Sequence, residues 1–320
     1  MRLTSFRLAG LLLIAAASAA TAADMPVKAL PMKAPVVGCG YSPITAANSQ
    51  ISVDYAGTHK DYVEYNPSNP PFVAPGLAVG APLDSEKGWV NGVSVTGSAM
   101  FNVGTLCNVY VFARGSYYDG KTDYWQYVGP TGQSYAKIWE GDFRLGKGFD
   151  VAPNWMLTPY LGGGLRSWDR DVCQAGPPAC VAGGYHENYS HGYIGAGLMA
   201  QFAATRQLVF TGSGLIGSTV DPELTGGRTA AGNPLVANFR TGLGTSVIYK
   251  VEGSADYAFT QNLHGNVGVE YTNWKYGQSS PFVADILGGL GVEPRSRTET
   301  VTVRAGLGWA FNPVPVVAKY

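Results

Sequence analysis

The segment that decides the fold reads VIYKVEGSADYAF and occupies residues 247–259. Apolar side chains stand at every second position, namely Val247, Tyr249, Val251, Ala255, Tyr257 and Phe259. Polar side chains stand at the alternate positions Lys250, Glu252, Ser254 and Asp256. Because successive side chains of a β-strand point to opposite faces, this pattern predicts a strand with one apolar face and one polar face.

Other segments have the same strand character, and each is bounded by Gly, Pro, Asn or Asp. The predicted strands cover residues 50–59, 88–101, 107–118, 135–149, 156–168, 189–203, 208–219, 245–259, 263–276 and 299–311. The chain therefore reads as an all-β protein of about ten strands.

The connections between these strands alternate in length. Short turns lie at residues 102–106, 150–155, 204–207 and 260–262. The other connections begin near Lys60, Asp119, Asp169, Val220 and Gly277 and run for roughly 15 to 30 residues, beyond ordinary hairpin lengths. Short turns on one side and long loops on the other are typical of a closed antiparallel transmembrane β-barrel. We therefore expect periplasmic turns and extracellular loops.

The two ends of the chain have other roles. Arg2 and Arg7 precede an apolar run that ends in small residues, which predicts a signal peptide at residues 1–22. Residues 23–48 form a Pro/Lys-rich segment that we expect to be an extended periplasmic lead-in. Its lysines either stay solvated or contact peptidoglycan or anionic lipid. The barrel then covers residues 49–311, and residues 312–320 form a periplasmic tail.

Composition excludes several classes. Glycine is abundant at 43 residues, aromatic residues reach 12%, and charged residues make up 14% with a net charge of zero. The chain is too apolar for disorder and too neutral for binding nucleic acid. Aromatic residues collect near the predicted strand ends, at Phe101, Phe149, Trp155, Phe202, Phe259 and Phe311 on the turn side and at Trp89, Tyr117 and Trp168 toward the loops. Such girdles favour a membrane wall over a soluble barrel.

The last predicted strand ends in RAGLGWAF, residues 304–311. It resembles the C-terminal signal of Gram-negative outer-membrane barrels, with Arg304, Gly306, Trp309 and Phe311 at the motif positions. The resemblance implies recognition by the outer-membrane assembly machinery. The chain departs from that pattern because it continues past the aromatic residue.

Three short segments extend the resemblance: ADMPVKA at residues 23–29, PYLGGGL at 159–165 and WKYGQS at 274–279. Together they resemble the opacity-type outer-membrane β-barrels of alpha-proteobacteria, a family of porin-like surface antigens. The resemblance implies a place in the cell outer membrane, with outer-membrane lipid and lipopolysaccharide as partners. Its members generally have eight strands, so eight is the alternative strand number.

The cysteines predict two bridges. Cys173 and Cys180 enclose a short stretch of one loop, and an oxidising compartment favours a disulfide between them. A free or metal-bound pair is the alternative. Cys39 and Cys107 both fall at the predicted periplasmic end, and we expect them to pair.

The polar faces of the predicted strands carry a nearly balanced set of charges. Its members are Asp54, Arg114, Glu140, Asp142, Arg144, Arg166, Lys250, Glu252, Asp256, Glu270 and Arg304. A barrel of about ten strands has a lumen barely wider than its side chains. The set therefore predicts a lumen plugged by ion pairs, and hence a structural or surface-recognition scaffold. A small-solute channel lined by the same charges is the alternative.

Catalytic and metal signatures are weak. The histidines, His59, His186, His191 and His264, do not have zinc-site spacings, and no cofactor is expected. Loop residues that an outer-membrane protease of the omptin type would use are His186 and Glu187 near Asp169 and Asp171, and His59 near Asp61. Because scattered loop acids are common, this protease is the second alternative and the prediction is a protein without enzymatic activity.

Overall fold

The computed structural model describes Gly40 and residues 42–68, 72–127, 131–173, 185–228 and 236–311, with Cys173 and Arg228 described by their backbone alone. The chain divides into two units, Met1–Gly38 and Cys39–Tyr320. The first unit, the expected signal peptide and the expected tail lie outside the described residues.

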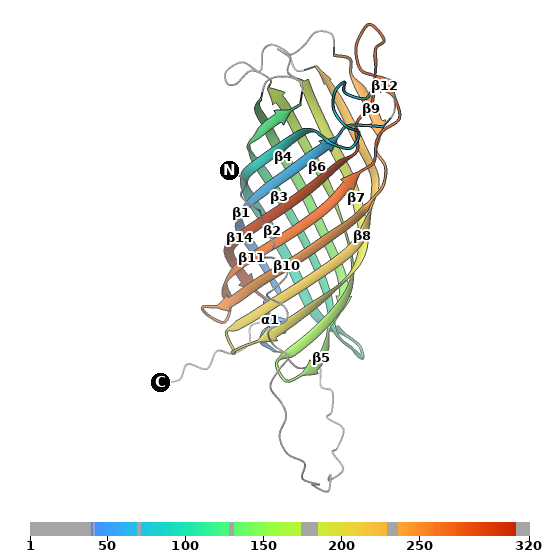
Figure 1. The fold of residues 1–320 in the computed structure, drawn as a ribbon. Coiled ribbons are helices and arrows are strands. Elements are labelled where there is room, and N and C mark those ends of the chain that lie inside the picture. Colours follow the sequence, from blue (N-terminus) through green and yellow to red (C-terminus); the bar gives the residue numbers. More distant parts are fainter. Residues whose placement is uncertain are drawn as a thin grey trace, which may run out of the picture. The chain divides into compact units, whose positions relative to one another are not determined.

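Ten long antiparallel strands close into a barrel (Figure 1). They are β1 (Gln50–Tyr65), β2 (Pro82–Val103), β3 (Leu106–Gln126), β4 (Gly132–Lys147), β6 (Trp155–Cys173), β7 (Tyr185–Ala203), β8 (Leu208–Arg228), β10 (Val247–Ala258), β11 (Leu263–Tyr276) and β14 (Ser296–Ala310). Each strand pairs with the next long strand in the chain, and β14 pairs with β1 to close the ring. The predicted fold class is confirmed.

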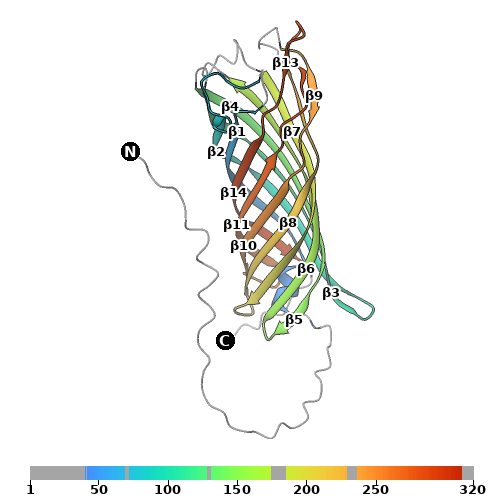
Figure 2. The same ribbon diagram turned by 45° about the vertical axis from the view of Figure 1, so that its right-hand side comes forward.

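Short additional strands lie at the two ends of the barrel (Figure 2). On the turn side, β5 (Phe149–Ala152) pairs with β6 beyond a break at Gly148. On the loop side, β9 (Phe239–Gly242) pairs with β8, and β12 (Phe282–Val283) pairs with β13 (Leu290–Gly291). Within the described residues, no helix is long and apolar enough to cross a membrane.

The strands extend farther toward the loops than predicted. β1 continues to Tyr65 and β3 to Gln126, so the expected loop starts near Lys60, Asp119, Asp169 and Val220 lie inside strands. The outward side chains turn polar at this level, which removes the contrast between the two faces. Lys87 and Asp61, for example, pair on the outside at 2.8 Å. Backbone hydrogen bonds nevertheless continue, and the barrel wall rises beyond its apolar band.

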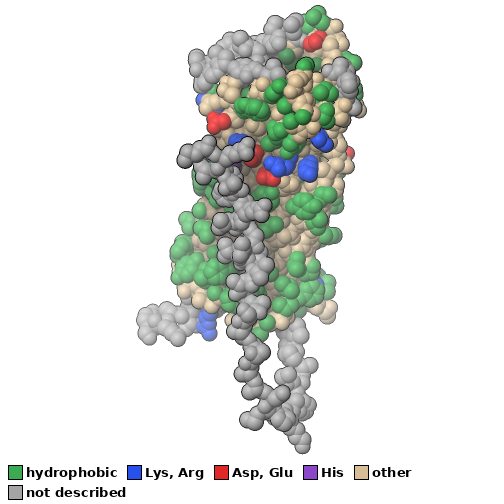
Figure 3. Space-filling model, in the orientation of Figure 1, with side chains coloured by type: hydrophobic (Ala, Val, Ile, Leu, Met, Phe, Trp, Pro, Cys, Tyr) green, Lys and Arg blue, Asp and Glu red, His purple; other side chains and the backbone are tan. Residues whose placement is uncertain are grey.

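The apolar band is clear on β14. Its outward residues Trp309, Leu307, Val303 and Val301 are exposed, whereas the alternate residues Thr302 and Arg304 are buried in the lumen. In the space-filling view, apolar side chains cover the lower wall and charged side chains gather above them (Figure 3). The outer wall therefore has the belt that a membrane-spanning barrel requires.

One aromatic residue of the predicted girdle is misplaced. Trp89, Phe101 and Phe311 face outward with substantial exposure, but Trp168 is 2% exposed. It has the same parity along β6 as Arg166 and therefore points into the lumen. Its position near a predicted strand end did not reveal its face.

The end of the expected lead-in forms a short helix instead of an unpaired segment. This helix, α1 (Pro43–Ala47), begins with a capping box, in which Ser42 Oγ accepts from Thr45 N at 3.2 Å and Thr45 Oγ1 accepts from Ser42 N at 2.8 Å. Ile44 is 3% exposed, and the following Asn48 donates to Gln201 Oε1 at 2.7 Å inside the barrel. α1 thus occupies the turn-side end of the lumen (Figure 1).

Candidate functional site

Strand parity directs the charged residues into the lumen. Every member of the predicted lumen set lies on the inward face, and most of these side chains are buried. They come from β1, β3, β4, β6, β10, β11 and β14, so side chains far apart in the sequence meet in the middle of the barrel.

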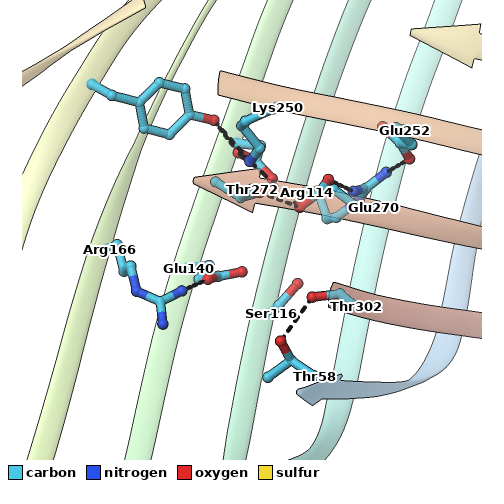
Figure 4. A network of polar contacts seen from close by, with 12 residues as sticks. Thr58, Arg114, Ser116, Glu140, Arg166, Lys250, Glu252, Glu270, Thr272 and Thr302 are labelled. Atoms are coloured by element: carbon cyan, nitrogen blue, oxygen red, sulfur yellow. Dashed lines mark hydrogen bonds and ion pairs between the residues drawn. The ribbon is translucent and has the colours of Figure 1, made fainter. Parts of the chain in front are cut away.

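A central network of ion pairs crosses the lumen (Figure 4). It consists of Arg114, Asp142, Arg144, Lys250, Glu252, Glu270 and Arg304. Arg114 contacts Glu252 at 2.7 Å and Glu270 at 3.1 Å. Arg144 contacts the other oxygen of Glu252 at 2.6 Å. Because β3 and β4 lie across the barrel from β10 and β11, these contacts bridge opposite walls.

The second half of the central network is built around Lys250. Its Nζ lies 2.6 Å from Asp142 Oδ1 and 3.7 Å from Glu270 Oε1. Tyr193 donates a hydrogen bond to the same Asp142 oxygen. Arg304 adds a longer contact to Glu270 at 3.6 Å. Each carboxylate of the network therefore has at least one cationic partner, as buried charges require.

Some members of the predicted set lie apart from this network. Among the described residues, Arg166 forms an ion pair with Glu140 only. Asp256 lies 2.6 Å from His264 Nδ1 and accepts from Gln50 Nε2 at 2.8 Å, next to α1. Asp54 accepts from Ser52 Oγ at 3.3 Å and has no cation within 4 Å among the described residues. The lumen set is thus divided into separate levels.

A polar cavity of about 120 Å³ separates α1 from the central network. Its lining includes Asn48, Gln50, Asp54, Arg114 and Glu252. A space of this size with polar lining residues is large enough for a few waters. α1 lies on one side of this cavity and the ion pairs of the central network lie on the other.

A second charged group, which we call the loop-side cluster, fills the lumen near the loops. It contains Lys60, Glu64, Asp84, Glu86, Arg170, Glu187 and Glu293. Lys60 and Glu86 pair at 2.8 Å with both side chains fully buried, and Lys60 Nζ lies 3.0 Å from the centroid of a Trp168 ring. Arg170 contacts Glu187 at 2.7 Å.

The loop-side cluster has more acids than bases. Two tyrosines satisfy part of this excess, since Tyr62 donates to Glu64 at 2.6 Å and Tyr189 donates to Glu293 at 2.6 Å. Glu187 and Glu293 lie above the apolar band. Burial and the neighbouring Glu64 raise the pKa of Glu187 to about 7, against the opposing effect of Arg170. Burial and the same Glu64 hold the pKa of Glu293 well above its ordinary range.

Most residues of this cluster were not predicted from the sequence, because the predicted strands ended too early. Lys60 and Glu64 continue the parity of Asp54 along β1, and Asp84 and Glu86 do the same at the start of β2. Following period two past residue 59 on β1, and back from residue 88 on β2, would have placed these residues in the lumen. Glu293 lies in the connection before β14, where no periodicity exists.

Of the candidate protease residues, Glu187 alone points into the lumen, where it belongs to the loop-side cluster, and the others face outward. His186 lies 2.8 Å from Asp171 and 3.6 Å from Asp169, but these side chains are on the outer face of β6 and β7 and are partly exposed. His59 packs edge-on against Trp89 on β2. Since β1 and β7 are not adjacent strands, His59 and His186 lie on separate parts of the barrel wall. The described residues hold no group of three metal-ligating side chains.

The terminal segment of the predicted assembly signal lies against β1. Arg304 and Gly306 face the lumen, whereas Trp309 and Phe311 are exposed on the outside. A Cβ at Gly306 would collide with the backbone and carboxylate of Asp54, its register partner. Glycine therefore permits the closing pair of strands to approach. Recognition by the assembly machinery stays a prediction.

The predicted disulfides stay predictions as well. Cys39, Cys180 and the side chain of Cys173 lie outside the described residues. Cys107 lies at the turn-side start of β3, as expected.

The connection between β11 and β14 presents an apolar hairpin tip made of Ile286, Leu287 and Leu290. These side chains are 64%, 80% and 62% exposed. Asp285 Oδ1 shapes the turn by accepting from Leu287 N at 2.8 Å and Gly289 N at 3.0 Å. At the hairpin base, Phe282 stacks on Phe239 with ring centroids 4.3 Å apart. The tip is thus held in an ordered turn, and no sequence pattern predicted it.

Comparison with known proteins agrees with this architecture. The barrel resembles the outer membrane protease OmpT from Escherichia coli, with a TM-score of 0.53, 12% identity, and coverage of 82% of this chain and 96% of that chain. The present chain thus has the fold of an outer-membrane β-barrel. Weaker matches include Neisserial surface protein A, with a TM-score of 0.29, 12% identity and coverage of 82% and 97%. Ail of Yersinia pestis matches with a TM-score of 0.28, 9% identity and coverage of 82% and 99%.

The sequence matches no protein-family profile and no curated protein. The barrels that it resembles in structure have varied roles, including protease, surface protein and attachment protein. At such low identity, the likeness shows the fold alone.

Proposed function

We propose that this outer-membrane barrel is a structural and surface-recognition scaffold with a closed lumen. The observation that carries the proposal is the central network, in which Arg114, Arg144 and Lys250 reach carboxylates across the barrel at 2.6 to 3.1 Å. A network that joins opposite walls blocks the path that a solute would need. α1 adds a second closure at the turn side.

The recognition role is supported by the apolar hairpin tip. Leu287 is 80% exposed at the loop end, although an ordered turn supports it. Exposed apolar side chains held in fixed geometry favour contact with another macromolecule, because their burial there releases hydration water. The tip would then be the part of the scaffold that a partner contacts.

Conductance of the refolded full chain in planar bilayers tests the closed lumen. We expect no steady ohmic conductance for the wild type. Arg144→Ala removes one cation from the central network, and we expect flickering openings from it. Arg240→Gln is the matched control, because Arg240 is 75% exposed on the outside. Steady wild-type channels for small ions would contradict the proposal.

A small-solute channel is the second candidate, and the polar cavity beside the central network favours it. The cavity would form part of a path if both α1 and the ion pairs moved. In that case wild-type conductance would depend on salt type, since Arg114 and Glu252 would act as the selectivity lining. The same bilayer recording distinguishes the two candidates.

We propose no catalytic role. The two Asp/His contacts that the described residues contain are His186 with Asp171 and Asp169 on the outer wall, and His264 with Asp256 in the turn-side lumen. The first contact lies on the outer wall and the second lies at the turn-side end of the lumen, whereas an omptin-like protease would place its Asp/His pair across the outer rim of the barrel.

A further inference from the structure

The outer wall changes from apolar to charged at a sharp level on β11 and β14. Going toward the loops, the last apolar outward residues are Tyr271 and Val301. Asn273 and Lys275 follow on β11, and Glu299 and Arg297 follow on β14. In an outer-membrane barrel this level faces the headgroups of the outer leaflet.

Two cations lie directly opposite each other at this level. Lys275 and Arg297 are register partners in the β11–β14 ladder, and both point outward. Like charges in this arrangement repel and weaken the pair of strands. A bound anion would relieve this repulsion. Among the described residues, Lys275 has no ion pair, and Arg297 has one, at 3.5 Å to Glu299.

A third cation extends the same face. Arg295 is exposed two residues beyond Arg297, with its guanidinium 6.0 Å from the centroid of the Tyr65 ring and without an ion pair among the described residues. We call Lys275, Arg295 and Arg297 the basic exterior patch. Blue side chains, with red ones among them, lie at this height above the apolar wall in Figure 3, on the side where β11 and β14 face the viewer.

The opposite wall is different. Lys137 on β4 points outward at a comparable level, but its register partners are Asp119 on β3 and Asp169 on β6. Its charge is therefore surrounded by acids within the sheet. Unpaired positive charge such as that on β11 and β14 is therefore not a general property of the charged belt.

We propose that the basic exterior patch binds the phosphate groups of a phosphorylated glycolipid of the outer leaflet, lipopolysaccharide. Guanidinium and ammonium groups are the usual phosphate ligands in proteins, and an arginine fork binds a phosphate through two parallel hydrogen bonds. The acyl chains of the lipid would lie against the apolar band directly below, along Val301 and Val303. One molecule would then contact both the charged and the apolar part of this wall.

The test measures retention of diphosphoryl lipid A by the refolded full chain, using native mass spectrometry after extraction from phosphatidylcholine vesicles that contain this lipid. We expect Lys275→Gln with Arg297→Gln to lower retention roughly tenfold or more, because each basic residue near a charged lipid surface contributes to binding. Lys121→Gln with Lys137→Gln is the matched control on β3 and β4, and it should retain the lipid like the wild type. Heat-modifiable migration verifies that all variants are folded.

Several results would overturn the proposal. One is equal retention by the patch variant and the wild type, and another is an equal loss in the control, which would indicate a non-specific charge effect. A further experiment uses vesicles that contain phosphatidylglycerol in place of lipid A. Equally tight retention of phosphatidylglycerol would reject the glycolipid in favour of any anionic lipid. Arg297→Lys should retain more lipid A than Arg297→Gln if phosphate binding is the cause.

Discussion

The two charged regions of the lumen use the same residue types in different proportions. In the central network, four cations, Arg114, Arg144, Lys250 and Arg304, meet three carboxylates, Asp142, Glu252 and Glu270. In the loop-side cluster, two cations, Lys60 and Arg170, meet five carboxyl groups, Glu64, Asp84, Glu86, Glu187 and Glu293. The two regions therefore satisfy buried charge in different ways.

The difference follows from their surroundings. The central network lies within the apolar band, where lipid surrounds the wall, and each of its carboxylates contacts a cation. The loop-side cluster lies at and above the level where the outer wall turns polar. Its excess acids accept hydrogen bonds from tyrosines, and burial raises the pKa of Glu187 and of Glu293. Removing a charge should consequently have opposite effects in the two places.

The largest expected effect comes from Arg114→Ala. Arg114 joins Glu252 and Glu270, and its loss leaves both carboxylates short of a partner in a buried site. Breaking a buried ion pair costs about 3 to 5 kcal/mol, so the unfolding midpoint of the refolded barrel should fall clearly. Denaturant unfolding followed by tryptophan fluorescence measures it. Arg114→Lys, which keeps the charge, should lose less, and an unchanged midpoint for Arg114→Ala would show that the central pairs do not stabilise the barrel.

A matched pair of isosteric changes sharpens the comparison. Glu252→Gln removes the acid between Arg114 and Arg144, and we expect it to destabilise the barrel by about 2 to 4 kcal/mol. Glu187→Gln removes one acid from a cluster that has too many, and we expect a change within about 1 kcal/mol at neutral pH, or a gain. The same unfolding measurement applies to both. An equal loss of unfolding free energy in the two variants would contradict the proposed difference between the central network and the loop-side cluster.

The loop-side cluster should also respond to pH. The ordinary pKa of a glutamate is 4.5, whereas burial in the folded cluster raises the pKa of Glu187 to about 7. Between these two pH values, unfolding of the cluster therefore releases a proton from Glu187. Its contribution to stability is complete below about pH 4.5 and falls as pH rises through 7. Glu293 anchors the connection before β14 to Tyr189, so this connection should loosen first.

Amide hydrogen exchange of residues 277–295 tests this response, after correction for the intrinsic pH dependence of exchange. We expect protection to decrease between pH 5 and pH 8, and to decrease less in Glu187→Gln, which cannot gain the charge. The strands around the central network serve as the internal control and should keep their protection. Protection that rises with pH at residues 277–295 would contradict the assigned sign.

The sequence predicted the barrel because period-two alternation and unequal connections are direct consequences of a wall between lipid and lumen. It predicted the central network for the same reason, since Arg114, Asp142 and Lys250 stand at polar positions of strongly alternating segments. It could not assign partners, because contacts across the lumen depend on barrel closure and strand tilt. Thus Asp256 pairs with His264 near α1 and not with an arginine of the network.

The errors have physical causes too. Lys60 and Trp168 were misplaced because alternation fades once the outer wall leaves the membrane, even though the strands continue. α1 was missed because a helix of this length, capped by Ser42 and held by Asn48, depends on the surrounding barrel more than on its own propensity. The hairpin tip depends on a turn held by Asp285, which no periodic pattern signals.

The smallest expected effect separates buried from exposed charge. Arg240 on β9 contacts Glu223 at 2.6 Å, a distance as short as those in the central network, but the arginine side chain is 75% exposed. Water and salt screen such a pair, and its formation restricts two flexible side chains, so Arg240→Gln should change the free energy of unfolding by no more than about 0.5 kcal/mol. The unfolding curve of this variant should overlay that of the wild type. A loss approaching that of Arg114→Ala would mean that short distance alone, and not burial between opposite walls, determines how strongly an ion pair stabilises this barrel.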